Sequence, residues 1–480
     1  MIDRNLLVII AAVTLLVGIL LLPEPAALER AGLSILLTSG GKACLAIMAF
    51  AVTLWVTEAV SFAVTSLIVV LLVPLLQISS YSEVVRAGFG SPIITFFIGV
   101  LMMSAAFTRS GLGTRLVYQI LNKVGTRADL VLLGILTSGA FLSSWITDMA
   151  AAAILLPICV GLLRDVGMKP GASNFGRAIM IAAAFGPLIG GIATPAGTGA
   201  NLVAIAQLKQ LAQVDVSFAR WMAYGVPASL LMVPVCWRLL LWLFPPEVER
   251  LPITTADIQR RLDELGPLQA IEWKTLLIFT VVIGTWLFTP MLSGWTGGWF
   301  APPIEAVALA GGLSLFLPGM RVLTWKEAED DINWGGIMLI VAGLSLGLAV
   351  FETGAARWLA WVLLGEITVV PALLQPFVIV LAVAGLHLLF SSNTVTASII
   401  MPILVALALD LGIDVWSIAA PAAFTSSLAF ILVSEGPTTI IPYSAGYFSI
   451  KDMARAGLLM TVCAAACVAA SVALNVWLRA

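Results

Sequence analysis

The chain has 480 residues, of which 61% are hydrophobic and only 10% are charged. Ordinary soluble domains carry roughly 25% charged residues, so this composition excludes a soluble globular protein and indicates a polytopic membrane protein. The net charge of −2 provides no basic surface for nucleic acid, which is excluded as a partner.

Apolar segments long enough to span a bilayer recur along the chain. The first runs from Leu6 to Leu22, a second region from Ala43 to Leu76, and the last from Leu459 to Leu478. Because a spanning helix needs about 20 mostly apolar residues, we expect an all-α fold with about eleven spans and two hairpin-like segments. The first run follows Asp3 and Arg4 and lacks a cleavage signature, which favours a retained first helix.

A polar interruption at residues 245–274 divides the chain near its middle. We expect a cytoplasmic linker there, with an N-terminal repeat at 1–244 and a C-terminal repeat at 275–480, because secondary transporters are commonly built from internal repeats. Two landmarks support the repeat. Asp148 corresponds to Asn393 at an offset of 245 residues, and Gly111 to Gly354 at an offset of 243.

Basic residues orient the two copies. The first copy carries seven of them between Thr108 and Arg177, whereas the matching stretch of the second, from Phe351 to Pro421, carries only Arg357. Lys and Arg collect in cytoplasmic loops, so we expect the first copy's connections inside and the second's outside. The repeats are therefore predicted to be inverted, in a multi-pass protein of the cell membrane with a cytoplasmic N-terminus.

Four polar breaks interrupt the apolar stretches. They are the tip of a first hairpin at about 130–165, a broken helix at 197–201, the tip of a second hairpin at about 372–408 and a broken helix at 434–439. Broken backbone is tolerated at membrane depth only in a protein interior or a wet cavity. Helix N-termini at such breaks direct N–H groups at an anion, and hydroxyls and carbonyls coordinate a cation. We therefore expect one binding site shared by the four breaks.

Several of these segments resemble a known family. The SNT triplet at 392–394, GTGAN at 197–201, WVTEAVSFAVTSL at 55–67 and the Trp- and Gly-rich block at 325–360 resemble the divalent anion/sodium symporter family. The resemblance runs through nearly the whole chain. It implies eleven helices with two re-entrant hairpins, a homodimer held by scaffold domains, elevator motion of a transport domain, and transport of dicarboxylates, citrate or sulfate with sodium as coupling ion.

The resemblance also implies the site, because Ser-Asn-Thr motifs at the family's hairpin tips bind substrate carboxylates and help to build two sodium sites. Carried over by position, the substrate-binding residues are Ser392, Asn393, Thr394, Thr147, Asp148, Pro437 and Thr438. The expected cation-binding residues are Ser143, Thr147, Asp148, Gly199, Asn393 and Glu435. No organic cofactor and no metal beyond sodium is expected.

Two acidic residues depart from the family pattern. The first tip reads Thr147-Asp148-Met149, and Glu435 stands where the family usually has a small neutral residue. An ionised Asp148 would repel a dicarboxylate unless a cation or proton lay between them. An acid at the bilayer centre costs roughly 2.5 to 3.5 kcal/mol, so both acids need partners. Three interpretations stay open: the two acids strengthen sodium sites, they carry protons in place of sodium, or they cap the broken helices. A cationic or zwitterionic substrate is a further alternative that is compatible with the first two.

The sequence thus predicts a cation-coupled symporter of small di- or tricarboxylates in which a cation neutralises Asp148 before the anion docks on Asn393, Thr394 and the helix N-termini. Two alternatives stay open. One is a sodium-independent or proton-coupled carboxylate exchanger or symporter, and the other is a metalloid-oxyanion or cation/proton permease of the wider ion-transporter superfamily. An enzyme is not expected, because the sequence has no nucleophile–base pair, HExxH motif or phosphate loop.

Overall fold

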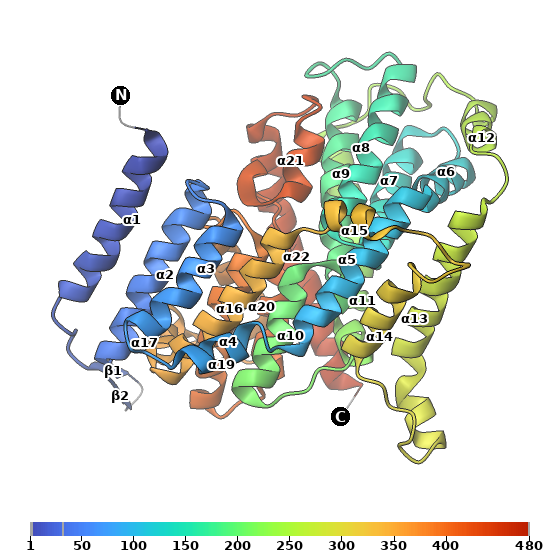
Figure 1. The fold of residues 1–480 in the computed structure, drawn as a ribbon. Helices are drawn as coiled ribbons and strands as arrows, with labels where there is room; N and C mark the ends of the chain where they lie inside the picture. The colour runs from blue at the N-terminus through green and yellow to red at the C-terminus, as the bar shows by residue number, and fades with distance from the viewer. Residues whose placement is uncertain (1–2, 31–32, 479–480) are drawn as a thin grey trace. The chain divides into compact units, whose positions relative to one another are not determined.

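The computed structural model describes residues 3–30 and 33–478, and these residues are almost entirely helical. They form twenty-two α-helices and three short 3-10 turns (Figure 1). The only strands in the described ranges are β1 (Leu28–Arg30) and β2 (Leu33–Ile35), which pair antiparallel with Leu28 opposite Ile35.

The chain forms two compact units, and the first consists of Met1–Ile94, Gly199–Val216 and Asn333–Ser426. Besides the two strands, this unit contains α1 (Arg4–Leu21), α2 (Ser39–Thr57), α3 (Phe62–Leu75), α4 (Tyr81–Gly88), α10 (Gly199–Ala212), α16 (Trp334–Glu352), α17 (Ala355–Leu364), η2 (Gly365–Val369), α18 (Gln375–His387), α19 (Asn393–Leu411) and α20 (Val415–Thr425).

The second unit consists of Thr95–Thr198, Ser217–Ile332 and Ser427–Ala480. Its elements are α5 (Pro92–Ser110), α6 (Leu112–Val124), α7 (Ala128–Ser143), α8 (Asp148–Asp165), α9 (Asn174–Gly191), η1 (Pro195–Gly197), α11 (Phe218–Leu243), α12 (Thr255–Glu264), α13 (Ala270–Trp295), α14 (Ile304–Ser314), α15 (Trp325–Asp331), η3 (Val433–Glu435), α21 (Pro437–Tyr443) and α22 (Ile450–Trp477).

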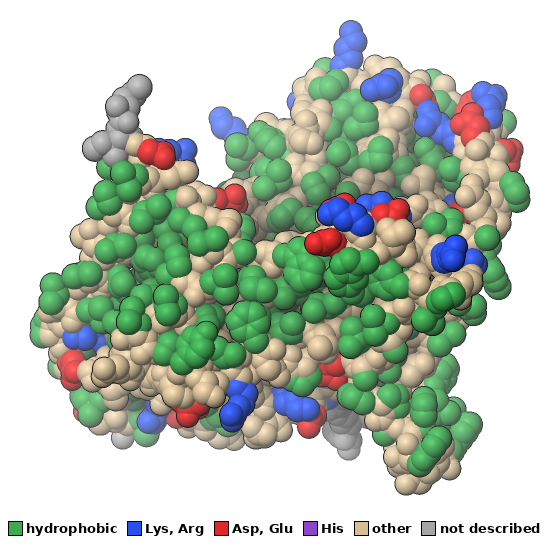
Figure 2. Space-filling model, viewed as in Figure 1, with side chains coloured by type: hydrophobic (Ala, Val, Ile, Leu, Met, Phe, Trp, Pro, Cys, Tyr) green, Lys and Arg blue, Asp and Glu red, His purple; other side chains and the backbone are tan. Residues whose placement is uncertain are grey.

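Eight helical segments in the described part of the chain are long and apolar enough to cross a bilayer: α1, α2, the run from Tyr81 to Ser110, α11, α13, α16, α19 and α22. Five further helices, α3, α7, α14, α18 and α20, are apolar but shorter. Large apolar side chains are exposed on α1, where Leu6, Leu7 and Ile10 are each about half accessible, and Figure 2 shows apolar side chains covering this part of the surface. Such a surface fits contact with lipid.

Helix α16 lies at the centre of the first unit, where it packs against α3, α4, α10 and α19. Small residues permit this close packing: a Cβ atom added to Gly88 would lie 2.5 Å from the Ser345 Oγ. The Gln207 side chain joins three helices, because its Nε2 donates to the Gly343 carbonyl at 3.2 Å and to the Ser398 carbonyl at 3.3 Å. Polar contacts of this kind fix α10 against α16 and α19.

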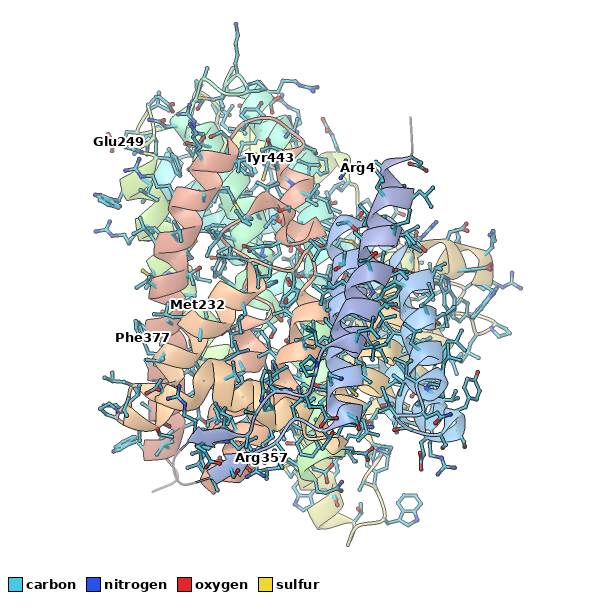
Figure 3. All side chains as sticks on the ribbon, turned by 90° about the vertical axis from the view of Figure 1, so that its left-hand side faces the viewer. Arg4, Met232, Glu249, Arg357, Phe377 and Tyr443 are labelled. Carbon is cyan, nitrogen blue, oxygen red and sulfur yellow. The ribbon has the colours of Figure 1, made fainter. Side chains whose placement is uncertain are left out.

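Arg357 anchors α17 to the C-terminal end of α19. Its Nε donates to Asp410 at 2.6 Å, and the Trp361 indole donates to the same carboxylate at 2.8 Å. Figure 3 labels Arg357 at one end of the bundle and Arg4 at the start of α1.

In the second unit the first hairpin packs on α9 through glycine. A Cβ atom added to Gly139 would lie 2.7 Å from the Pro187 Cδ, and one added to Gly186 would lie 2.8 Å from the Leu136 carbonyl oxygen. A Cβ atom at Gly190 would overlap the backbone of Ala140. The backbones of α7 and α9 are therefore in direct contact, as small residues allow in membrane helices.

The start of α9 is held by Glu247. The carboxylate accepts the backbone N–H groups of Asn174 and Phe175, the latter at 3.2 Å, while Ser173 caps the helix by accepting from the Gly176 N–H at 2.9 Å. Burial raises the pKa of Glu247, but the backbone N–H groups and the Ser173 hydroxyl outweigh burial and hold the pKa below its ordinary value. An ionised Glu247 therefore stabilises this helix start.

The expected linker at 245–274 contains a helix and is firmly attached. Helix α12 packs on α6, and the last five residues of the expected linker already belong to α13. Arg115 is buried and donates to Glu272 at 2.6 and 3.0 Å, and also to the Gly266 carbonyl at 2.9 Å and the Leu265 carbonyl at 3.2 Å. A bidentate pair with further carbonyl acceptors satisfies the buried guanidinium and ties the linker to α6.

The elements recur along the chain. Gly111 and Gly354 both adopt left-handed backbone, with φ of 79° and 77°, and each separates a long helix from a shorter one. Capping boxes start α4 at Ser80 and α15 at Thr324, an offset of 244 residues. By this correspondence α2–α4 match α13–α15, and α5–α10 match α16–α21.

The compact units do not coincide with the two sequence halves. The first unit takes α2–α4 and α10 from the N-terminal half and α16–α20 from the C-terminal half. The second unit takes α13–α15 and α21 from the C-terminal half and α5–α9 from the N-terminal half, which are the counterparts of those elements. Each unit therefore combines segments of both halves in the same pattern.

Candidate functional site

The first hairpin tip lies in the second unit, between α7 and α8. Thr147 is the N-cap of α8, and its Oγ1 accepts from the Ala150 N–H at 3.4 Å. Asp148, the first residue of the helix, accepts from the Met149 N–H at 2.8 Å. Ser143, Thr147 and Asp148 are all buried, so the tip is enclosed by protein.

Asp148 is joined to the second broken helix. Its carboxylate hydrogen-bonds to the Thr438 side chain, and α21, which begins at Pro437, packs on α8 and α9. Thr438 lies 290 residues after Asp148 in the sequence. The structure therefore brings together Asp148, Thr438 and Pro437, which the sequence placed in one site.

Ser143 lies beside this carboxylate and fits a sodium ligand. Its hydroxyl oxygen is fully buried, and none of the described residues hydrogen-bonds to it. A Cβ atom added to Gly191 would lie 3.3 Å from the Ser143 Oγ and 3.7 Å from the Asp148 Cβ, so both side chains border the same glycine. A buried hydroxyl that the protein leaves unsatisfied next to a carboxylate offers the hard oxygen donors that suit a small cation.

Glu435 has a different environment. It is 3% exposed, and its carboxylate accepts the N–H of Leu432 at 2.9 Å and that of Ile431 at 3.2 Å. Both donors belong to the segment that leads into η3. The side chain therefore satisfies backbone groups of the broken helix, as a capping residue does.

The second hairpin tip lies in the first unit, between α18 and α19. Ser392 is the N-cap of α19, but within the described residues its side chain makes no capping hydrogen bond to the helix. The Ser391 Oγ donates to the Trp55 carbonyl at 3.3 Å, which fixes the tip to the end of α2. Ser392, Asn393 and Thr394 are half-buried, in contrast to the enclosed first tip.

Helix α10, which begins at Gly199, packs on α19 and α20 of this same unit. Asn201 is fully buried in its first turn. The sequence interpretation grouped Gly199 with Ser143 and Asp148, and this grouping stays a prediction; Gly199 begins the segment Gly199–Val216 of the first unit. In each unit, then, a hairpin from one half of the chain packs against a broken helix from the other half.

Sequence reasoning missed the backbone contacts that hold the first tip. Thr194 donates to the Ser144 carbonyl at 2.5 Å, and the Ser144 hydroxyl donates to the Ala140 carbonyl at 2.8 Å. A Cβ atom at Gly197 would lie 2.6 Å from the Ser143 carbonyl oxygen. The signal that was available is the density of glycine between 186 and 199, which marks close backbone approach.

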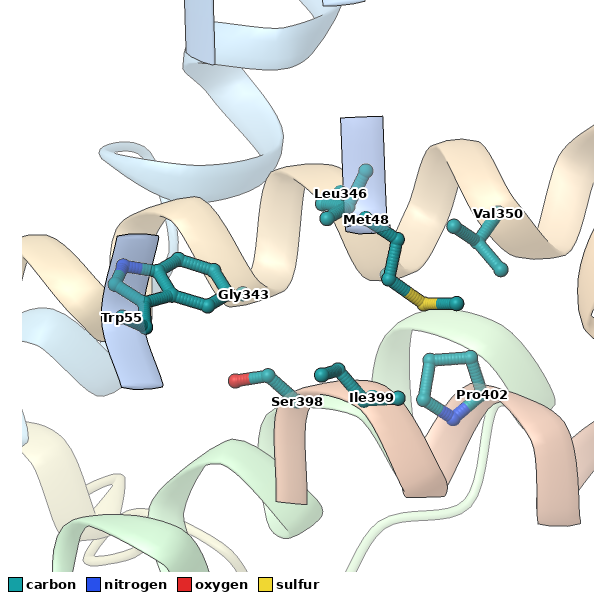
Figure 4. A pocket seen from close by; sticks show the side chains of 9 residues that line it. Met48, Trp55, Gly343, Leu346, Val350, Ser398, Ile399 and Pro402 are labelled. Atoms are coloured by element: carbon teal, nitrogen blue, oxygen red, sulfur yellow. The ribbon is translucent and has the colours of Figure 1, made fainter. Parts of the chain in front are cut away.

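A narrow cavity lies between α2, α16 and α19 in the first unit (Figure 4). Its walls are almost wholly apolar and include Met48, Trp55, Leu346, Ser398 and Pro402. It has room for roughly one water molecule. This cavity is too small and too apolar for a carboxylate, so it is not the binding site expected from the sequence.

Membrane-crossing helices, hairpins with polar tips and interrupted helices are features of multi-pass membrane transporters. The chain belongs to the family described as the sodium:sulfate symporter transmembrane region, which matches residues 3–479. The family expected from the sequence, the transporter class and the multi-pass membrane location are confirmed.

Named relatives are similar over most of their length. The sodium-dependent dicarboxylate transporter SdcS of Staphylococcus saprophyticus is 30% identical over 443 residues, which cover 88% of this chain and 83% of the relative. SdcS of Staphylococcus aureus strain USA300 is 29% identical over 450 residues, covering 88% and 84%. The crystal structure of the YdaH transporter of Alcanivorax borkumensis superposes with a TM-score of 0.59 at 15% identity, covering 99% of this chain and 98% of that one. The latter likeness concerns the fold alone, and with it the expected all-helical, multi-span fold is confirmed.

Proposed function

We propose that this protein is a secondary transporter that carries small dicarboxylates across the cell membrane together with sodium. Membership of the symporter family and the similarity to proteins named sodium-dependent dicarboxylate transporters support the reaction class. The observation that carries the proposal at the level of residues is the contrast between the two hairpin tips, one enclosed and acidic and the other half-buried and neutral.

The acidic tip is the proposed cation site. Ser143, Thr147 and Asp148 supply two hydroxyls and one carboxylate, and the unsatisfied Ser143 hydroxyl supports a ligand at this place. A bound sodium ion neutralises Asp148, which removes its repulsion of an incoming anion. Anion binding is therefore expected to be weak without the cation.

The neutral tip is the proposed anion site. The amide of Asn393 and the hydroxyls of Ser392 and Thr394 stand at the start of α19, a helix of 19 residues whose first turn receives no capping hydrogen bond from the Ser392 side chain in the described structure. The N–H groups of a helix start carry partial positive charge and favour a carboxylate. Binding of one carboxylate of the substrate here is consistent with the neutral Ser-Asn-Thr triplet.

Glu435 is proposed to act as a cap and not as a cation ligand, because both of its carboxylate oxygens already accept backbone N–H groups. On this proposal, Glu435 would leave the group of cation-binding residues expected from the sequence. Asp148 is thus the acidic residue on which coupling depends.

The eleven spans, the two re-entrant hairpins, the inverted repeats, the division into scaffold and transport domains with elevator motion, and the homodimer remain proposals. The recurrence of α2–α10 in α13–α21 supports two repeats, and the basic residues of the first copy's connections support their opposite orientation. The bounds 1–244 and 275–480 describe these repeats along the chain.

The test uses the purified protein in liposomes with radiolabelled succinate as the C4 dicarboxylate. Wild-type uptake is expected to require an inward sodium gradient. Asp148→Asn is expected to raise the sodium concentration for half-maximal uptake about tenfold or more, because the cation loses its charged ligand. Glu435→Gln, a matched loss of a buried acid, is expected to lower stability while leaving sodium dependence unchanged.

A proton-coupled carboxylate symporter is the second candidate, favoured by the buried position of Asp148. In that case a pH gradient drives uptake without sodium, and Asp148→Asn abolishes the pH dependence. If Asp148→Asn leaves both the sodium and the pH dependence unchanged, Asp148 is a capping residue and the proposed coupling is wrong. Uptake driven by internal substrate alone would identify an exchanger.

A further inference from the structure

An apolar groove runs between α13 and α14 in the second unit, far along the chain from any hairpin tip or broken helix. Figure 1 shows the two helices side by side, and they are in contact. The groove has a volume of about 560 Å³. Its size suits an extended hydrocarbon chain and exceeds what isolated packing defects leave in a protein.

One face of each helix lines the groove. On α13 this face includes Leu277, Val281 and Thr285, and on α14 it includes Ala306 and Ala310. The spacing of about four residues keeps these side chains in a stripe along each helix. Leu277 and Val281 are exposed on this face, and such an apolar surface fits contact with lipid.

One end of the groove is basic. The Lys274 Nζ, one turn before Leu277 on α13, donates to the carbonyls of Gly319 at 2.7 Å and Met320 at 2.9 Å, and Met320 lines the groove. An ammonium group has three N–H donors, so these two bonds leave one for a further acceptor. Arg321 follows directly, with an exposed side chain that forms no ion pair within the described residues.

The turn that carries Arg321 has unusual backbone. Arg321 adopts a positive φ of 44°, two residues after Gly319 at 91°. Left-handed backbone is unfavourable for a residue with a side chain and is retained only where the surroundings impose it. The Lys274 bonds to the carbonyls of Gly319 and Met320 and the bond from the Arg321 N–H to the Leu317 carbonyl at 3.1 Å hold this turn, so Arg321 directly follows the lining residue Met320.

We propose that this groove binds an anionic phospholipid, with one acyl chain between α13 and α14 and the phosphate at Lys274 and Arg321. Charge complementarity favours this occupant, because the positive inside rule puts Lys274 at the cytoplasmic surface, where anionic lipids are met. The exposed Trp273 beside Lys274 is typical of a helix end at the level of lipid headgroups. None of the residues that line the groove belongs to the proposed transport site.

The test is native mass spectrometry of the purified full-length protein with phosphatidylglycerol or phosphatidylcholine added at equal concentration. Wild-type protein is expected to retain phosphatidylglycerol preferentially. Arg321→Gln is expected to lower that preference about fivefold, as the loss of one basic residue at an anionic surface does. The control is Lys326→Gln, a nearby lysine that already pairs with Glu329 and Asp330 and is expected to change nothing.

A second pair of variants tests the groove itself. Ala310→Trp fills the groove and is expected to reduce retention of both lipids, whereas Leu313→Trp, at an exposed position of α14 outside the groove, is expected to retain them. Each variant is first shown to elute as a single species. Equal retention of the two lipids by wild-type protein, or unchanged retention by Ala310→Trp, would overturn the proposal. The proposal would also be wrong if Ala310→Trp converted a dimer into a monomer and changed nothing else. A second copy of the chain, and not a lipid, would then cover the groove.

Discussion

The contact between α7 and α9 makes Gly190 one of the least replaceable residues near the first hairpin tip. A Cβ atom there would overlap the carbonyl group of Ala140 and lie 2.5 Å from the Ala140 Cα, and backbone cannot rotate away as a side chain does. Overpacking of this kind costs about 1–3 kcal/mol, against roughly 1 kcal/mol gained by replacing glycine with alanine in a helix. Gly190→Ala is therefore expected to lower stability and to displace the tip that carries Asp148.

Two other glycines supply the controls. Gly284 in α13 has no atom within 4 Å of an added Cβ, and Gly284→Ala is expected to be neutral or to stabilise the protein. Gly191→Ala meets the Ser143 hydroxyl at 3.3 Å, so it is expected to impair sodium-dependent uptake more than stability. Thermal unfolding in detergent and uptake by liposomes measure the two effects. If Gly190→Ala has the same unfolding temperature and uptake activity as Gly284→Ala, the reasoning from the contact between α7 and α9 is refuted.

Two further predictions concern the linker at 245–274 and the start of α9. Arg115→Met leaves the buried Glu272 without its partner and is expected to lower the free energy of unfolding by about 3–5 kcal/mol. Arg115→Met combined with Glu272→Met is expected to lower it less. Thermal unfolding of wild-type protein and the two variants tests this order. Because the pKa of Glu247 is lowered in the folded protein, its ionised carboxylate contributes to folding stability above the ordinary carboxyl pKa of 4.5. This contribution is lost as the pH falls through the lower folded-state pKa. Stability measured against pH is expected to show this loss in wild-type protein and not in Glu247→Gln, and identical profiles for the two proteins would refute it.

The sequence located the tips well because a polar residue inside an apolar run is a local signal. Asp148 and Asn393 each begin a helix, and Gly111 and Gly354 each adopt the left-handed backbone that a helix boundary requires. The repeat offsets depend on the same local signals. The family resemblance then supplied the transport reaction, which no local pattern contains.

Long-range pairing left no such signal. Asp148 meets Thr438 across 290 residues, and only the family resemblance, not a pattern within either segment, had placed the two residues in one site. The helix within the linker was within reach of local analysis, because Thr254 and Asp257 form a capping box, but charge patterning drew attention to the loop instead.

The way the two units share the chain limits how the protein can be assembled. If the polypeptide were cut within the linker, neither fragment would contain a whole unit, because each hairpin would be left without the interrupted helix it packs against. The two fragments would therefore have to be synthesised together and to associate before either unit could fold.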